Sequence, residues 1–118
     1  MILFCMRIQP VEGRRAETLE LLQSVLGPIN ALPGCSDLSI SEELGGEHTI
    51  FFQERWAEEG GFNDHVRSPL FNRVLAAIEL SSADPQVEIH GVHHTEGLGL
   101  IYRLRGVPAE KSTSNPGA

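Results

Sequence analysis

The sequence is poor in basic residues. Nine lysine and arginine residues stand against 16 aspartate and glutamate residues, which gives a formal net charge of −7 over 118 residues. The single lysine, Lys111, lies near the C-terminus. A surface that binds nucleic acid or an anionic membrane needs clustered positive charge. The composition therefore argues against both kinds of partner.

Long apolar runs are also lacking. No run approaches the roughly 20 apolar residues that cross a bilayer, and residues 1–7, MILFCMR, have neither the basic segment nor the cleavage site of a signal peptide. We therefore expect a cytoplasmic protein. With only two cysteines, Cys5 and Cys35, and no export signal, reduced core thiols are favoured over a disulfide.

Several chemical motifs are missing as well. There is no phosphate-binding glycine loop, no Cys-x-x-Cys pair and no Gly-x-Ser-x-Gly turn. His90, His93 and His94 are close in sequence, but on a strand His93 and His94 point to opposite faces and His90 and His94 stand about 13 Å apart. One zinc ion cannot bridge that distance. We expect no metal site and no bound cofactor.

The apolar pattern predicts one domain over residues 1–105 and a flexible tail over residues 106–118, which are rich in proline, serine and glycine. Helical periodicity marks residues 14–32, and a short helix is expected at 57–66. Ser68 and Pro69 are expected to cap a third helix. Extended segments are predicted at 2–9, 38–44, 49–56, 85–95 and 98–104, with a hairpin turn at Gly45-Gly46. The order β-α-β-β-α-β is that of a ferredoxin-like α+β sandwich with an antiparallel sheet.

Two of the predicted strands carry apolar residues on both faces. In the first strand Leu3 and Cys5 face away from Phe4 and Met6, and in the third Phe51 faces away from its apolar neighbours. Helices on one side of a sheet leave its other face uncovered. A second copy related by a two-fold axis is the simplest cover, so we expect a homodimer.

One stretch carries a family resemblance. Pro33, Gly34 and Cys35 open a predicted strand, a Glu-x-Trp pair ending at Trp56 closes the next, and His65 follows nine residues later. Over residues 1–104 this order resembles the antibiotic biosynthesis monooxygenase family. The resemblance implies a dimeric α/β barrel, built by packing two sheets together, with the C-terminal segment reaching the neighbour.

The chain departs from two subgroups of that family. Members that oxidise polycyclic phenols to quinones without a cofactor have a polar Asn and a Tyr where this chain has Phe52 and Phe62. Phenyl rings exclude water but cannot hydrogen-bond a phenolate. Haem-degrading members have an Asn, a Trp and a ligating His where this chain has Arg7, His65 and Val74. Haem degradation is therefore disfavoured.

The candidate site centres on His65, which could act as a general base in an apolar cleft. A helix-end histidine that bonds a backbone carbonyl is the alternative. Trp56 borders the same pocket in resembling proteins, although a strand-end indole could simply pack in the core or a dimer interface. Phe52, Phe62 and Phe71 are the other expected substrate-binding residues.

These residues support three functional hypotheses. The first is a cofactor-independent monooxygenase that acts on a small aromatic or quinone-like molecule. The second is a non-catalytic dimer of the same fold that binds a small apolar molecule or another partner. The third is an isomerase-like activity, because proton transfer by a single histidine needs no oxygen.

Overall fold

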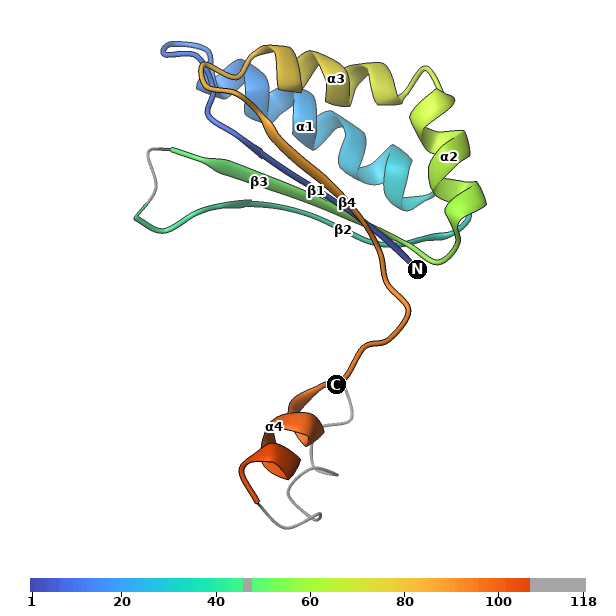
Figure 1. The fold of residues 1–118 in the computed structure, drawn as a ribbon. Coiled ribbons are helices and arrows are strands. Elements are labelled where there is room, and N and C mark those ends of the chain that lie inside the picture. Colours follow the sequence, from blue (N-terminus) through green and yellow to red (C-terminus); the bar gives the residue numbers. More distant parts are fainter. Residues whose placement is uncertain (46–47, 107–118) are drawn as a thin grey trace.

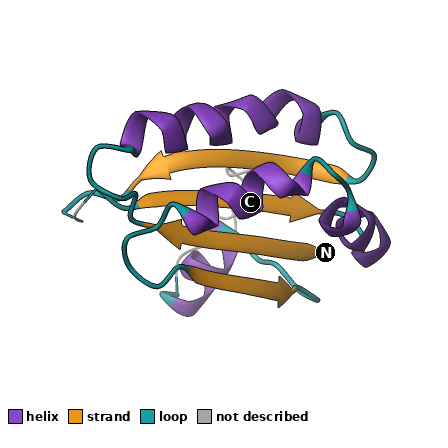
Figure 2. Cartoon of the chain, turned by 90° about the horizontal axis from the view of Figure 1, so that it is seen from above, coloured by secondary structure: helices purple, strands orange, loops and turns teal. Residues whose placement is uncertain are grey.

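The computed structural model describes residues 1–45 and 48–106. Four antiparallel strands form one sheet in the order β2-β3-β1-β4. Helices α1, α2 and α3 cover one face; α1 and α3 run along the strands and α2 lies at one end (Figures 1 and 2). In chain order the elements are β1 (Ile2–Ile8), α1 (Arg15–Asn30), β2 (Cys35–Glu42), β3 (Ile50–Trp56), α2 (Glu59–Arg67), α3 (Phe71–Glu79), β4 (Gln86–Gly91) and α4 (Leu98–Leu104). The predicted ferredoxin-like α+β arrangement is confirmed.

The core lies between the sheet and the helices. Side chains alternate along a strand, so β1 and β3 each send every second residue toward the helices. From α1 the residues Leu22, Val25 and Ile29 meet them at helical spacing, and all three are buried. The buried sheet residues of this cluster are Phe4, Met6, Ile8, Ile50, Phe52 and Trp56.

The start of α3 differs in part from the prediction. Ser68 and Pro69 do not cap this helix: α3 follows Leu70 and has no side-chain cap. Instead, the Ser68 hydroxyl donates to the carbonyl oxygen of His65 at 2.6 Å, at the C-terminal end of α2. A residue before proline is pushed into extended backbone, and Ser68 has φ −79° and ψ 156°. Pro69 follows the end of α2 and also starts the turn that leads into α3, in which the amides of Phe71 and Asn72 donate to the carbonyl oxygens of Ser68 and Pro69.

The segment predicted as a fifth extended stretch, 98–104, is also corrected, because it forms α4. The fourth strand ends at Gly91, and the chain then leaves the sheet on the side opposite the other helices (Figure 1). Backbone groups away from a strand edge need partners within their own segment, and a helix provides them. None of the helices in the described part of the chain is long and apolar enough to cross a membrane.

The face of the sheet that carries no helix is mixed in character. Leu3 and Phe51 are partly exposed there, and the Arg7 guanidinium lies 4.7 Å from the centre of the Phe51 ring. Gly45 opens the predicted hairpin turn with φ 74°. Gly46 and residues 107–118 of the predicted tail lie outside the described residues.

Candidate functional site

A pocket of about 650 Å³ opens where the start of β2, the end of β3 and α2 meet. Its walls come from residues 32–34, from the segment that follows β3, and from one side of α2. Trp56 and His65, two of the candidate site residues, both contribute to the wall. Glu58 and Asp64 are its acidic residues, and no lysine or arginine is among the described residues that line it.

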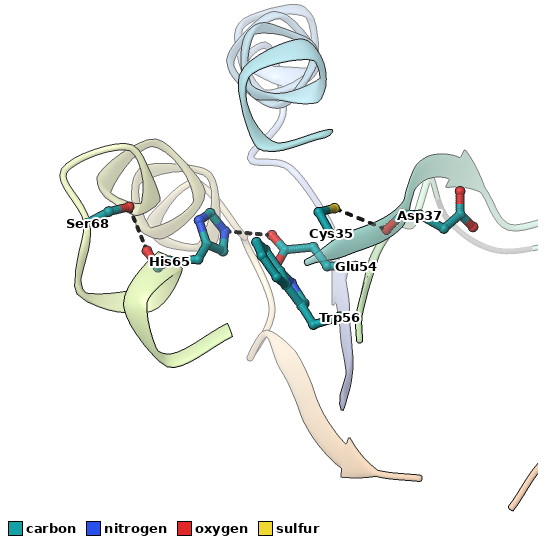
Figure 3. Close-up of polar contacts among 6 residues, drawn as sticks. All are labelled: Cys35, Asp37, Glu54, Trp56, His65 and Ser68. Carbon is teal, nitrogen blue, oxygen red and sulfur yellow. Dashed lines mark hydrogen bonds and ion pairs between the residues drawn. The ribbon is translucent and has the colours of Figure 1, made fainter. Parts of the chain in front are cut away.

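Beneath the pocket wall lies a buried polar group of three side chains. Trp56 Nε1 donates to Glu54 Oε1 at 2.8 Å, and His65 Nε2 lies 3.1 Å from Glu54 Oε2. Figure 3 shows these side chains gathered between the end of β3 and α2. Glu54 and Trp56 have no exposed surface, and His65 is 2% exposed. We call Glu54, Trp56 and His65 the buried triad.

The sequence analysis did not identify Glu54 as a site residue, although its position two residues before Trp56 on the same strand could have indicated it. Glu54 and Trp56 are two residues apart on one strand, so they point to the same face. Since Phe52 and Trp56 were expected to face inward, the carboxylate between them had to face inward too. A buried carboxylate needs hydrogen-bond donors, and the indole and imidazole supply them.

The imidazole of His65 is held on two sides by aromatic rings. It stacks on Trp56 with a centroid distance of 5.0 Å and an angle of 26°, and it meets Phe71 edge-on at 5.2 Å. Its Nε2 contacts Glu54 rather than a backbone carbonyl, so the alternative expected from the sequence is not what the structure shows. Its Nδ1 is buried and has no hydrogen-bond partner.

The predicted substrate-binding phenylalanines lie in the core. Phe52, Phe62 and Phe71 are at most 7% exposed, and none is among the described residues that line the pocket. All three rings pack around Phe4, with centroid distances of 5.9 to 6.2 Å. Only Phe71 also contacts the His65 ring. Their role in binding a substrate stays a prediction.

Two glycines let the backbone close over Trp56. Gly34 has φ +89°, a conformation that disfavours side chains, and its carbonyl accepts from the Ala57 amide at 2.8 Å. A Cβ on Gly61 would lie 3.4 Å from both the Pro33 carbonyl oxygen and the indole. Gly34 therefore allows the backbone to turn close to the indole of Trp56. The absence of a side chain at Gly61 allows α2 to pack close to the same ring.

Neither the two cysteines nor the histidines near the C-terminal end of the sheet offer a clear alternative site for nucleophilic or metal chemistry. Cys5 and Cys35 are free, and burial raises the pKa of both thiols, which lowers the fraction of reactive thiolate. His90 and His94 each lie near an acidic neighbour, Glu88 at 3.6 Å and Glu96 at 3.0 Å. Residues 1–45 and 48–106 hold no group of three side chains suited to a metal ion.

Solved structures of similar fold cover most of this chain. Rv0793 from Mycobacterium tuberculosis is 21% identical with a TM-score of 0.72, over 81% of this chain and 98% of that one. A conserved protein from Methanosarcina mazei Go1 is 22% identical with a TM-score of 0.69, over 75% and 89%. SnoaB, a cofactor-independent oxygenase from Streptomyces nogalater, is 17% identical with a TM-score of 0.66, over 80% and 94%.

At these identities the structures establish the fold alone. No curated protein matches the chain. The family model for antibiotic biosynthesis monooxygenase matches residues 1–77, which include β1 to β3, α2 and every member of the buried triad. The chain therefore belongs to the antibiotic biosynthesis monooxygenase family.

Proposed function

We propose that the protein is a cofactor-independent monooxygenase that oxidises a small aromatic or quinone-like molecule in this pocket, with His65 as the general base. The observation that carries the proposal is the unpartnered Nδ1 of a buried histidine in the pocket wall. Buried polar atoms nearly always have partners, so an orphaned basic nitrogen beside a pocket is a candidate for chemistry. The family and the SnoaB fold support the same reaction class.

In this reaction His65 removes a proton from a CH₂ group that an aromatic ring or carbonyl has made acidic. The anion gives one electron to O₂, and the two radicals combine as a peroxide, which takes the proton back from the imidazolium. The hydroperoxide then loses water as its O–O bond and the remaining C–H bond break. One CH₂ group and one O₂ become one C=O group and one H₂O. Apolar walls that exclude water protect the anion from reprotonation.

The charges around the pocket narrow the proposed substrate class. Glu58 and Asp64 are acidic, and no lysine or arginine lines the described pocket to balance a substrate anion. A carboxylate or phosphate on the substrate would be repelled. The proposed substrate is therefore neutral when it binds. Because His65 is only 2% exposed, the proposal requires α2 or the 32–34 segment to shift before a substrate can reach Nδ1.

A homodimer is part of the proposal. The helix-free face of the sheet carries partly exposed Leu3 and Phe51, and α4 projects from the chain with Ile101 and Leu104 exposed. Apolar groups in these places suit a second copy that covers the sheet and receives α4. Sedimentation equilibrium of the full chain, with Phe51→Glu as the disrupting variant, measures this association. A stable monomer at micromolar concentration would contradict it.

The alternative function is a non-catalytic dimer that binds a small apolar molecule. The buried phenyl rings of Phe52 and Phe62 favour it, because they occupy positions that are polar in the phenol-oxidising subgroup and can donate no hydrogen bond. Under this alternative the buried triad holds α2 on the sheet and performs no proton transfer.

Oxygen uptake separates the two functions. A panel of phenols, hydroquinones and aromatic ketones with a benzylic CH₂ is incubated under air, and consumption of O₂ and formation of the carbonyl product are followed. His65→Gln keeps an N–H donor for Glu54 but removes the base, so we expect the rate to fall by about 10²- to 10⁴-fold. His94→Gln, an exposed histidine, is the matched control. Binding without turnover across the panel supports the alternative.

A further inference from the structure

We infer that Glu54 is a positioning residue: it fixes the ring proton of His65 on Nε2 and so makes Nδ1 the nitrogen that accepts the substrate proton. The inference rests on the proposed function for its catalytic consequence. Its structural part, which nitrogen carries the proton, stands on the buried triad alone.

The donors around Glu54 determine how its oxygens are used. An indole N–H can only donate, so Trp56 commits Oε1 as an acceptor at 2.8 Å. The second oxygen, Oε2, then faces His65 Nε2 at 3.1 Å. We take Glu54 as the carboxylate, the form with an acceptor oxygen for each of the two nitrogens, and the nitrogen opposite Oε2 then carries a proton.

Three arrangements of the His65 protons can be compared. With the proton on Nδ1 alone, the lone pair of Nε2 would face a carboxylate oxygen, which is repulsive. With both nitrogens protonated, the charged ring would leave a buried Nδ1–H without an acceptor. With the proton on Nε2 alone, the contact to Glu54 is made and only a neutral lone pair lacks a partner. The doubly protonated ring gains the attraction of the carboxylate but leaves a charged, buried N–H without an acceptor, whereas the third arrangement leaves only a neutral lone pair without a partner. We assign the third arrangement on this ground.

The aromatic neighbours keep the ring in this orientation. Trp56 stacks on one side of the imidazole and Phe71 meets it edge-on, and the residue is 2% exposed. Trp56 therefore acts twice: its N–H holds the carboxylate and its ring face holds the imidazole. The substrate meets a histidine whose free lone pair is already set, as a positioned base requires.

Replacing Glu54 by glutamine, which has nearly the same shape, is expected to move the ring proton of His65 from Nε2 to Nδ1. An amide has one acceptor oxygen and one donor NH₂ group. Since the Trp56 indole can only donate, it takes the amide oxygen and leaves NH₂ facing His65 Nε2. That nitrogen must then accept, and the ring proton moves to Nδ1. The variant keeps its histidine but presents the substrate with an N–H.

The test is nitrogen-15 NMR of histidine-labelled full-length protein, read together with turnover. In the wild type we expect the Nε2 signal of His65 to be that of an N–H nitrogen and Nδ1 that of an unprotonated one. In Glu54→Gln we expect the two to exchange, and the rate to fall by about 10⁴-fold, the scale seen when the carboxylate behind a catalytic histidine becomes an amide. Glu59→Gln, an exposed change on α2, leaves both readouts unchanged.

The outcomes separate this inference from the proposed function. A wild-type His65 that carries its proton on Nδ1, or on both nitrogens at working pH, overturns the inference whether or not Glu54→Gln folds. The expected proton positions without turnover of any substrate would leave the positioning role of Glu54 intact and remove the oxygenase. Unchanged turnover in a Glu54→Gln protein with exchanged proton positions overturns Nδ1 as the base.

Discussion

The molecule contains the same hydrogen-bonding arrangement twice, once buried and once in water. In the buried triad, Glu54 accepts from an indole on one oxygen and lies 3.1 Å from His65 Nε2 on the other. Beside α4, Glu96 contacts Arg103 at 2.6 Å and His94 Nε2 at 3.0 Å in the same way. The His65 side chain has no exposed surface, whereas that of His94 is 78% exposed. The donor distances are alike, but the two sites differ in burial and in one donor, since the Trp56 indole is neutral and the Arg103 guanidinium is a cation.

Burial changes what happens when a partner is lost. At the exposed site water replaces a missing donor at once, and such pairs contribute little to stability. At the buried site no water replaces it, and the remaining charge stays unpaired in an apolar surrounding. Because water cannot replace a partner there, the buried triad is suited to holding the ring proton of His65 on one nitrogen.

The largest expected difference between the two sites comes from removing the histidine at each of them. His65→Ala leaves the buried carboxylate of Glu54 without its second hydrogen-bond donor, and we expect a loss of about 3 kcal/mol or more in the free energy of unfolding. His94→Ala is the matched change at the exposed site, where we expect less than about 0.5 kcal/mol. Urea denaturation of both variants measures the difference. Equal losses would show that burial does not distinguish the two sites.

The second expected effect concerns the other donor. Trp56→Phe keeps an aromatic ring beside His65 but removes the N–H that Glu54 Oε1 accepts, which we expect to cost about 1–3 kcal/mol. Arg103→Gln removes the corresponding donor at the exposed site and changes stability by less than about 1 kcal/mol. Thermal unfolding compares them. Because Trp56→Phe also removes ring volume from the core, a loss no larger than that of the exposed variant would contradict the role of the indole N–H.

The smallest effect is a dependence on pH at the exposed site. The Arg103 guanidinium and then the His94 ring hold the pKa of the Glu96 carboxyl below its usual value of 4.5. A group whose folded pKa is lowered stabilises the folded state above its unfolded pKa, and this contribution is lost as pH falls through the folded pKa. We therefore expect the contacts beside α4 to weaken as pH falls below 4.5. A carboxyl titration of Glu96 by NMR measures it, and a midpoint at or above the usual value would contradict it.

The sequence predicted the sheet and the core well because both follow from local alternation. Apolar residues at every second position of β1 and β3 identify the inward face before any contact is known. The same rule places Glu54 inward, but it does not reveal the donor on α2. That contact depends on how residues 57–58 turn and on how closely Gly61 lets the helix approach, which are properties of the assembled fold.

The predictions failed where a local sequence pattern is compatible with two different structures. Ser68 before Pro69 suits a helix start in the sequence, yet its hydroxyl bonds the last turn of α2 in the structure. Residues 98–104 were predicted as a short extended segment, but they lie away from the sheet and form α4 (Figure 1). Local pattern alone does not show which neighbour a segment will have.

Trp56 is the chain's one tryptophan, and it gives the protein a built-in optical reporter. The indole has no exposed surface, its ring stacks on His65, and it belongs to the pocket wall. Intrinsic fluorescence excited in the indole band therefore comes from this single position. A molecule that enters the pocket changes the emission directly, so a ligand library can be screened by fluorescence on the unmodified protein, before any substrate or reaction is known.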